Sequence, residues 1–365
     1  MGQTSMQVEI ITDRDQWNRF VEASPAGNIT QTFEWGELRD ALGGEVLRLG
    51  AVENGELHGV MLAVAIQAPV LRRPYLYAPR GPVVNDPASP ALAALCARAE
   101  QEAHRHGAFM LKVEPNVPDG DAGWLSALAA LGFKRNRFAN HPRRSWVLDI
   151  RPSEDDLLAG MKEKWRYNIR LAGRKGVQVR EARTPEDVDT FYTLYQETAA
   201  RDGFFIHPKQ HYADILRLYG QRDAAVLLLA EYEGTPIAGL IAMRCGPVAT
   251  YMFGASSNRE RNRMPNHLLQ WTAIRWAWAR GCTLYDFRAI AEVLDAKEDL
   301  YSLYTYKQGY GGYSVLTLET HDRPYHLPTY WAYERLLAVK RARDRRQHER
   351  DLAAREKPAT DAKTP

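Results

Sequence analysis

The first half of the chain alternates short apolar runs with longer segments of helical periodicity. Apolar positions that recur every three to four residues predict helices, whereas short runs rich in β-branched residues predict strands. We therefore predict helices at residues 17–23, 35–42, 90–106 and 124–131, and strands at residues 45–52, 57–67, 75–78, 108–114 and 145–150. An Asn-Gly turn at residues 54–55 joins the first two strands into a hairpin.

The second half repeats this order of elements. Helices at 185–201 and 209–219 precede strands at 224–233, 235–245 and 248–255, a helix at 266–280 and a buried strand at 282–287. The recurrence predicts an internal duplication of a mixed α/β (α+β) unit, which fits two tandem GNAT-like domains of the acyl-CoA N-acyltransferase fold. We place the first domain at 6–150, completed by a C-terminal helix at 325–350. The second domain follows at 151–324, and a disordered tail at 351–365.

Composition narrows the class of protein. The 365 residues carry a net charge of +3, which is too small to indicate nucleic acid by itself. No apolar run reaches the ~18 residues that span a bilayer, and the polar N-terminus lacks a signal-peptide core. Cys96, Cys245 and Cys282 are far apart in apolar segments, as expected of buried thiols in a reducing compartment. We therefore expect a cytoplasmic protein.

Residues 284–313 carry the most distinctive candidate chemistry. A strand leads through an acidic linker to a helical turn with three tyrosines, among them Tyr306, and one basic residue, Lys307. A glycine-rich turn and another strand, at 313–319, follow. A lysine among aromatic rings can stabilise negative charge that develops on a reacting group. The simpler interpretation is an aromatic helix that packs on a sheet while the lysine reaches solvent.

Four basic residues, Lys162, Arg166, Arg170 and Arg174, are spaced four apart between the two halves. This spacing places them on one face of a helix, where like charges destabilise the helix unless an anion compensates them. RNA phosphates, a pyrophosphate or an anionic membrane surface would serve. A solvated face balanced by acidic residues elsewhere explains the pattern equally well.

Motifs for cofactors and metals are missing from the sequence. The turn that would hold the coenzyme A pyrophosphate in an acetyltransferase corresponds to residues 81–87 and 256–265, and neither has closely spaced glycines. No Gly-x-Ser-x-Gly elbow, Walker loop or zinc-type histidine pair occurs. His207 and His267 are interpreted as capping or surface groups. We predict neither a bound cofactor nor a metal.

Six short motifs occur in order along the chain. They are QTFEWG at 31–36, YAPRGP at 77–82, LKVEP at 111–115, KWRYNIR at 164–170, YDFR at 285–288 and YKQGY at 306–310. Together they resemble the Fem family of aminoacyltransferases, which build the interpeptide bridge of peptidoglycan. The resemblance extends over nearly the whole chain, from Trp17 to Val339.

The resemblance implies tandem GNAT-like domains and a tRNA-dependent reaction. An amino acid (Gly, Ala or Ser) would pass from aminoacyl-tRNA, the co-substrate, to the stem-peptide side-chain amine of a peptidoglycan precursor. That precursor is lipid II or UDP-MurNAc-pentapeptide. The amine attacks the ester carbonyl, and the tetrahedral oxyanion needs support. By the resemblance, Lys307 faces this oxyanion and Tyr306 lies beside the tRNA end.

The resemblance also implies a groove for the precursor. Arg201 matches a position that contacts the precursor's phosphates, for which a guanidinium fork is well suited. Tyr212, Tyr251 and Phe253 match wall positions of the groove. The first-domain side of the groove is matched by Trp35, Arg39, Arg80 and Glu114.

Two departures from the family pattern bear on substrate binding. Glu37 stands where a relative that binds the nucleotide-linked precursor has a basic residue, and Arg39 is the candidate to replace it. The long helical insertion of staphylococcal relatives has no room between the helices near Arg201 and Lys209. We therefore hypothesise that the basic face at Lys162, Arg166, Arg170 and Arg174 holds tRNA.

Two other functions fit part of the pattern. An acyl-CoA-dependent N-acyltransferase could act on an envelope or exopolysaccharide precursor, although the missing phosphate-loop glycines argue against it. A catalytically silent RNA- or envelope-binding module would leave the tyrosine-rich segment around Lys307 without a purpose. The slight basic excess and the Lys/Arg-rich C-terminal end of the chain would suit transient docking of the proposed transferase at the inner face of the plasma membrane.

Overall fold

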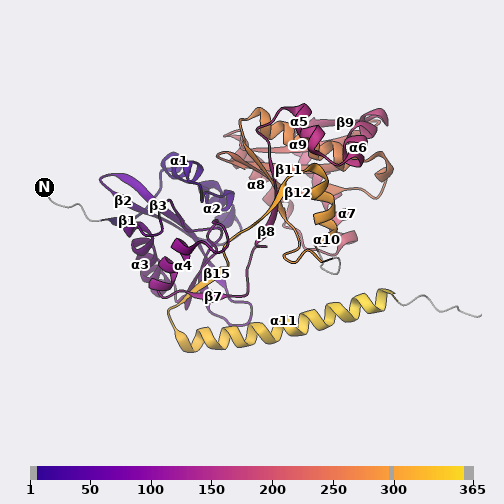
Figure 1. Cartoon of the computed structure of the whole chain (residues 1–365). Coiled ribbons are helices and arrows are strands. Elements are labelled where there is room, and N and C mark those ends of the chain that lie inside the picture. Colours follow the sequence, from indigo (N-terminus) through magenta and orange to yellow (C-terminus); the bar gives the residue numbers. More distant parts are fainter. Residues whose placement is uncertain (1–5, 296–299, 357–365) are drawn as a thin grey trace, which may run out of the picture.

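The structure is a computed structural model that describes residues 6–295 and 300–356, and it contains two mixed sheets with their own helices (Figure 1). The first sheet has the strand order β1-β2-β3-β4-β6-β15-β7, with β5 paired to β3. Its strands are β1 (Gln7–Ile10), β2 (Glu45–Glu53), β3 (Glu56–Gln67), β4 (Pro74–Ala78), β5 (Val83–Val84), β6 (Met110–Val113), β7 (Lys134–Asn136) and β15 (Thr320–Pro324).

The second sheet has the order β14-β8-β13-β12-β11-β10-β9. Its strands are β8 (Arg144–Asp149), β9 (Val177–Glu181), β10 (Ala225–Tyr232), β11 (Thr235–Cys245), β12 (Val248–Ser256), β13 (Leu284–Ala289) and β14 (Tyr313–Leu316).

Helices cover both sheets and connect their strands. With the first sheet lie α1 (Arg14–Ala23), the short 3₁₀ helix η1 (Ile29–Gln31), α2 (Phe33–Ala41), α3 (Pro90–Arg105) and α4 (Ala122–Ala130). With the second lie α5 (Glu154–Gly160), α6 (Glu163–Arg174), α7 (Pro185–Asp202), α8 (Lys209–Gly220), η2 (Arg261–Arg263), α9 (Pro265–Ala279), α10 (Tyr301–Lys307) and η3 (Gln308–Tyr310). The chain ends with α11 (Leu327–Glu356).

Local sequence explains the elements that were predicted. The hairpin β2–β3 turns at Asn54 and Gly55, which both have positive φ, as the tight turn between twisted strands requires. Helix α3 begins at Pro90, whose fixed φ suits the first helical position. Its buried residues Leu92, Leu95, Cys96 and Ala99 follow the helical period, so one stripe of the helix faces the sheet.

The two sheets repeat one unit of structure. In each, an antiparallel hairpin and a third strand are followed by a helix, which leads to a strand parallel to the third. These are β4 and β6 around α3, and β12 and β13 around α9. Parallel neighbours need such a crossover, because the chain must return to the same edge. The predicted internal duplication of a mixed α/β unit is confirmed.

The predicted domain boundaries are wrong at two strands. Strand β8 falls inside the predicted first domain, yet it pairs with β13 and β14 in the second sheet. Conversely, β15 falls inside the predicted second domain but pairs with β6 and β7 in the first. The first domain is therefore built from two separate stretches of chain, whereas the second is one continuous stretch from β8 to β14. A strand's own sequence indicates that it is a strand but does not say which open edge it will join.

Helix α11 packs on the first domain and continues past the predicted end at residue 350, up to Glu356. Its buried residues Tyr330, Tyr333 and Leu337 form a small core with Phe109 and other residues of the first sheet. Residues 357–365 of the predicted tail lie outside the described residues. No helix in the described part of the chain is both long and apolar enough to cross a membrane.

A continuous core fixes the two domains against each other. One cluster of buried side chains runs from Trp17 and Leu38 in the first domain to Phe191 and Tyr219 in the second. At this interface the hydroxyls of Thr32 and Tyr219 are 2.6 Å apart in a fully buried contact. A cavity near the interface is therefore held by packing on both sides.

Candidate active site

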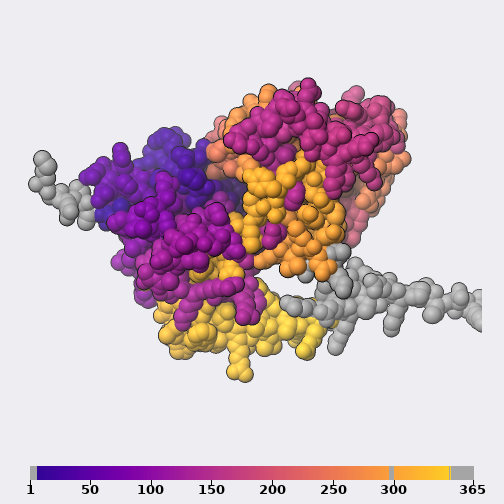
Figure 2. Space-filling view, viewed as in Figure 1, coloured from indigo at the N-terminus to yellow at the C-terminus, as the bar shows by residue number. Residues whose placement is uncertain are grey.

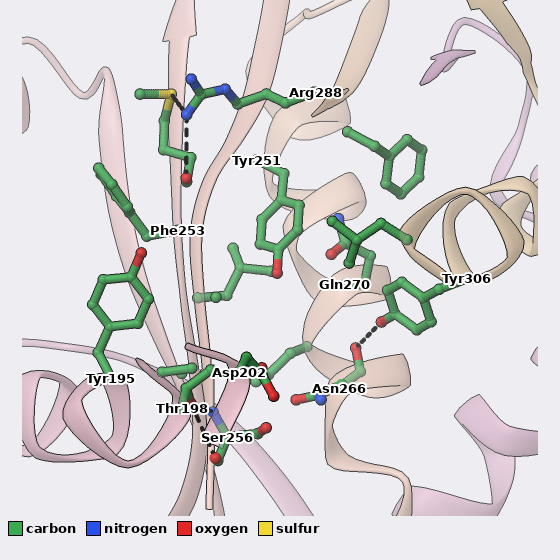
Figure 3. A pocket seen from close by; sticks show the side chains of 18 of the residues that line it. Tyr195, Thr198, Asp202, Tyr251, Phe253, Ser256, Asn266, Gln270, Arg288 and Tyr306 are labelled. Atoms are coloured by element: carbon green, nitrogen blue, oxygen red, sulfur yellow. Dashed lines mark hydrogen bonds between the residues drawn. The ribbon is translucent and has the colours of Figure 1, made fainter. Parts of the chain in front are cut away.

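A cavity that Lys307 lines, called the main cavity below, lies where two parallel strands of the second domain separate. β12 and β13 pair over only three residue positions, from Val248 opposite Leu284 to Thr250 opposite Asp286. Beyond that point a cavity of about 420 Å³ opens between them. Residues of α7 and α10, together with residues of the first turns of α9, complete the lining of this cavity. Figure 3 shows Tyr195 and Phe253 on one side, with Gln270 and Tyr306 on the other.

Lys307 lies in this cavity wall with a buried amine. The residue is 4% exposed, and its Nζ donates a hydrogen bond to the carbonyl oxygen of Ala289 at 2.6 Å. Burial lowers the pKa of Lys307 to about 7; the charge of Asp286 partly offsets this effect and that of Arg288 reinforces it. Among the described residues, no carboxylate lies within ion-pairing distance of Nζ. The amine can therefore gain or lose its proton near neutral pH, and it does not reach solvent as the simpler interpretation required.

Five of the predicted functional residues share this cavity. Lys307 and Tyr306 come from α10, Tyr251 and Phe253 from β12, and Arg201 from the end of α7. They are far apart in sequence, and the separation of β12 from β13 brings them together. Aromatic rings thus line a site whose charged groups are few and fixed, as is typical of small-molecule and acyl-transfer pockets.

Asp286 and Arg288 are functional candidates that sequence reasoning quoted in a motif without assigning a role. In β13, Tyr285 and Phe287 are fully buried, so the alternate residues Asp286 and Arg288 point to the opposite side. Arg288 lines the main cavity and also a second one of about 100 Å³, which lies between the domains. Its positive φ of 62° is uncommon for a residue with a side chain and marks a site held by its surroundings.

Tyr306 is held by a network that reaches across three helices. Its hydroxyl donates to the carbonyl oxygen of Asn266 at 3.0 Å, a bond drawn in Figure 3. The indole Nε1 of Trp165 in α6 donates to the Tyr306 carbonyl oxygen at 3.0 Å. A Cβ on Gly309 would come within 2.0 Å of the Trp165 ring, so only glycine fits there. Helix α6 is therefore fastened directly to the segment that carries Tyr306 and Lys307.

His267 belongs to the same network, so the prediction of a capping or surface group is wrong. Its ring contacts Trp165 and Tyr306 edge-on, with centroids 5.7 and 5.5 Å apart. Burial, with a smaller effect of Lys164, lowers the pKa of His267 to about 4. The imidazole is therefore neutral at physiological pH, and its Nε2 lies 3.2 Å from the amide nitrogen of Asn168, which donates to it.

Comparison with known proteins agrees with the duplicated fold. Residues 12–119 match the model of the FemAB family, and residues 159–308 match that of the acetyltransferase (GNAT) domain. A lipid II:glycine glycyltransferase of Staphylococcus saprophyticus is 27% identical, and the alignment covers 89% of this chain and 95% of that protein. Its counterpart from Staphylococcus aureus is 26% identical, over 89% and 94%. The chain is thus similar to the FemAB family in its first domain and to acetyltransferase (GNAT) domains in its second.

A solved structure has the same architecture as this chain. The crystal structure of FemX superposes with a TM-score of 0.82 at 24% identity, covering 90% of this chain and 99% of that one. The predicted fold, two tandem GNAT-like domains in a mixed α/β protein, is therefore confirmed.

Arg201 lines the main cavity, and every nitrogen of its guanidinium group donates a hydrogen bond. Its Nη1 donates to the Ser256 carbonyl oxygen at 2.9 Å and to Asn258 Oδ1 at 3.0 Å. Its Nε donates to Asp202 Oδ1 at 3.0 Å. These bonds fix the guanidinium plane at the edge of the cavity, and a phosphate would have to share or replace them.

Two predicted groove residues are buried away from both cavities, so their assignment to the groove wall is wrong. Tyr212 is fully buried behind the wall and packs edge-on against Phe253, with centroids 5.2 Å apart. Glu114 is 3% exposed and accepts hydrogen bonds from the Asn140 amide at 2.6 Å and from Thr320 Oγ1 at 3.0 Å. Burial alone would raise the pKa of Glu114, but hydrogen bonds, led by that of His141, hold it at about 2.

The remaining first-domain predictions lie at the domain interface. Arg80 lines the smaller cavity, opposite Arg288. Trp35 and Arg39 lie on α2 and line neither cavity. Burial lowers the pKa of His207 on the second domain, and the positive charge of Arg39 adds to this effect, so the two side chains are near each other.

The basic face of α6 is only partly available to a ligand. Arg166 is half-buried and donates to the carbonyl oxygens of Ala159 (3.1 Å) and Met161, so it caps the end of α5. Lys162, Arg170 and Arg174 are exposed. Arg166 therefore has a structural role, and three of the four predicted positions form the accessible face.

The approach to α9 is poor in the groups that hold phosphate. The helix begins at Pro265, which has no backbone N–H to offer an anion at its first position. Instead, Arg261 in η2 lines the cavity. Within the described residues, no group of three or more His, Cys, Asp or Glu side chains is placed to hold a metal ion.

Proposed function

We propose that this protein is a FemAB-type aminoacyltransferase, which transfers an amino acid, Gly, Ala or Ser, from aminoacyl-tRNA to a peptidoglycan precursor. The acceptor is the side-chain amine of the stem peptide. Two relatives aligned along 89% of the chain are lipid II:glycine glycyltransferases, which supports this class of acceptor. The observation that carries the proposal is the buried amine of Lys307, which has a pKa of about 7 and lies in an aromatic cavity.

The chemistry requires support for one developing negative charge. The acceptor amine attacks the ester carbonyl, a C–N bond forms, and the C–O bond to the tRNA ribose breaks. The amine loses a proton and the departing ribose oxygen gains one. In its charged form Lys307 has three N–H donors, of which one is used by Ala289, so the others are free to face the oxyanion.

The substrates approach this amine from different elements. Tyr306 lies next to Lys307 on α10 and would contact the aminoacylated end of the tRNA. Helix α6 is fastened to the same segment through Trp165, so its exposed residues Lys162, Arg170 and Arg174 would meet the tRNA backbone nearby. Arg201, at the mouth of the cavity, would bind the phosphates of the precursor.

The reaction can be tested directly. Purified protein is incubated with a pool of charged tRNAs and either lipid-linked or nucleotide-linked precursor, and the product is read by mass spectrometry. We expect a mass gain of one or more amino-acid residues that ribonuclease abolishes. Absence of any gain with both acceptors would contradict the proposal.

The proposed contact of α6 with tRNA is tested by a separate variant. Replacing Arg170 and Arg174 by glutamate should raise the KM for tRNA by about tenfold or more, because two phosphate contacts are lost and repulsion is added. Turnover at saturating tRNA should change little. The matched control replaces Arg19 and Arg183, two exposed arginines on other elements, and should behave as wild type. An unchanged KM in the α6 variant would exclude this helix as the tRNA contact.

The second candidate function is N-acyl transfer from coenzyme A. It is favoured by the acetyltransferase (GNAT) domain model, which matches residues 159–308. It is weakened by the proline that begins α9 and by the lack of a glycine-rich turn before it. A titration of coenzyme A separates the two: we expect no saturable binding, and tight binding would favour this alternative.

A further inference from the structure

Helix α11 presents an outward row that alternates apolar and basic residues. Trp331, Arg335, Val339 and Arg343 are spaced four apart and so lie along one side of the helix. Trp331 is 56% exposed and Val339 is 63% exposed. Leu336, 44% exposed, and Arg346 flank the row. In Figure 1, α11 lies at the lower edge of the molecule and extends beyond the first domain.

The opposite side of α11 is used for packing and holds the acidic residues. Tyr330, Tyr333 and Leu337 are buried against the first sheet. Glu334 accepts a hydrogen bond from Asn136 Nδ2 at 3.1 Å, and Asp344 lies seven residues after Leu337, which places it on the same side. Between Leu327 and Asp344, the outward row therefore carries positive charge without an acidic neighbour on its own face.

The combination of charge and apolar surface distinguishes between partners. RNA would use the arginines but would leave Trp331 and Val339 without a purpose. A helix that lies in the interface of a membrane uses both, because its apolar residues enter the acyl boundary and its basic residues meet anionic headgroups. Trp331 suits this role, since indole is favoured at the level of the headgroups. The Lys134 ammonium, 4.9 Å from the Trp331 ring, adds another cation to the same patch.

We propose that the outward row of α11, formed by Trp331, Arg335, Val339 and Arg343, docks the protein on an anionic phospholipid surface. The contact is peripheral and reversible, because the helix is too polar to span the bilayer. Figure 2 shows the described part of α11 at the periphery of the molecule, so that a flat surface can reach it. The inference goes beyond the proposed reaction and does not depend on it, since lipid binding can be measured without any substrate.

The test is sedimentation of the full-length protein with vesicles. Phosphatidylcholine vesicles with and without phosphatidylglycerol are compared at low and high salt. We expect binding that needs phosphatidylglycerol and weakens with salt. Replacing Arg335 and Arg343 by glutamate should weaken binding at least about 25-fold, because each basic residue near an anionic surface contributes about fivefold. Replacing Trp331 and Val339 by serine should weaken it about tenfold or more.

A matched control separates position from net charge. The Arg19→Glu/Arg183→Glu variant has the same change in charge on α1 and after β9, which lie away from α11 in Figure 1, and should bind as wild type. Circular dichroism confirms that each variant is folded. An equal loss of vesicle binding in this control variant would overturn the proposal. Equal binding of the wild-type protein to vesicles with and without phosphatidylglycerol would overturn it as well.

An RNA surface would give a different pattern. In that case the Arg335→Glu/Arg343→Glu variant would lose tRNA binding in the absence of vesicles, while the Trp331→Ser/Val339→Ser variant would bind vesicles and tRNA normally. That result would also overturn the membrane assignment. A protein that binds vesicles as expected but transfers no amino acid would leave the docking surface standing and reject only the reaction.

Discussion

Within the part of the chain that the structure describes, each domain buries one lysine, and the two lysines have opposite environments. Lys112 on β6 is 1% exposed and lies 2.8 Å from Asp322 Oδ1, a fully buried carboxylate. Lys307 on α10 is 4% exposed and has a carbonyl oxygen as its hydrogen-bond partner. The first domain therefore holds its buried lysine in an ion pair, whereas the second holds a buried amine of low pKa on a helix that follows the repeated unit. Stability favours the first arrangement, and proton-dependent chemistry needs the second.

The difference arises at one edge of each sheet. In the first domain, β15 joins the free edge of β6 and supplies Asp322 opposite Lys112. In the second, the corresponding edge of β13 is taken by β8, which places Val147 and Leu148 opposite Asp286 and Tyr285. Strand β15, which returns to the first domain after the second, thus supplies the carboxylate that pairs with Lys112.

The largest effect should come from removing the unpaired amine. Lys307→Met should fold, bind precursor and lose turnover by about a hundred- to a thousandfold, as loss of one oxyanion donor does in acyl transfer. Turnover is measured by mass spectrometry with saturating tRNA and precursor, and folding by circular dichroism. Full activity in this variant would refute the role of Lys307.

Replacing the paired lysine, Lys112, should change the stability of the fold. Lys112→Met should lower the free energy of unfolding by about 3–5 kcal/mol, because Asp322 stays charged and buried with the Asn136 amide but no cation as its partner. Denaturant unfolding measures the loss. The double variant Lys112→Met/Asp322→Asn serves as the control and should recover part of the lost free energy of unfolding. Unchanged stability in the single variant would mean that the pair has no structural role.

The pH dependence of stability should also separate the two domains. Lys307 loses its proton near pH 7 in the folded protein, whereas in the unfolded chain a lysine does so near 10.4. Between these values the unfolded state binds more protons, so stability rises with pH, by about 2 kcal/mol from pH 7 to 9. Unfolding of wild type and of Lys307→Met at both pH values tests this. We expect Lys307→Met to lack this increase in stability. An identical increase in both proteins would show that it comes from titratable groups other than Lys307.

The smallest effect concerns the carboxylate near Lys307. Asp286 partly offsets the lowering of the Lys307 pKa, so Asp286→Asn should make that amine lose its proton at a lower pH. If the charged amine supports the oxyanion, wild-type turnover falls as pH rises through about 7, and this fall should move to lower pH in the variant. Glu114→Gln, which changes a buried carboxylate of the first domain, is the control and should leave the profile in place. A profile unmoved by Asp286→Asn would contradict the coupling.

Much of the fold was predictable because the evidence for it is local. The hairpins, the long helices α3 and α9 and their repetition follow from periodicity and turn residues near each element. The site was predictable in part: Lys307, Tyr306, Tyr251, Phe253 and Arg201 do share one cavity. Tyr212 and Glu114 were misplaced because a polar atom on an aromatic or acidic residue does not reveal whether that residue faces a cavity or the layer behind it.

The sequence by itself determined which segments form strands and helices, that the unit occurs twice and which short motifs carry chemistry. The tertiary structure alone decided that β8 opens the second sheet while β15 returns to the first, and that Arg166 caps α5. It also decided that Lys112 pairs with Asp322, whereas within the described residues Lys307 has no acidic partner. The physical reason is that the pKa of a buried group depends on every neighbour within a few ångströms. Most of those neighbours come from segments that are distant in the chain.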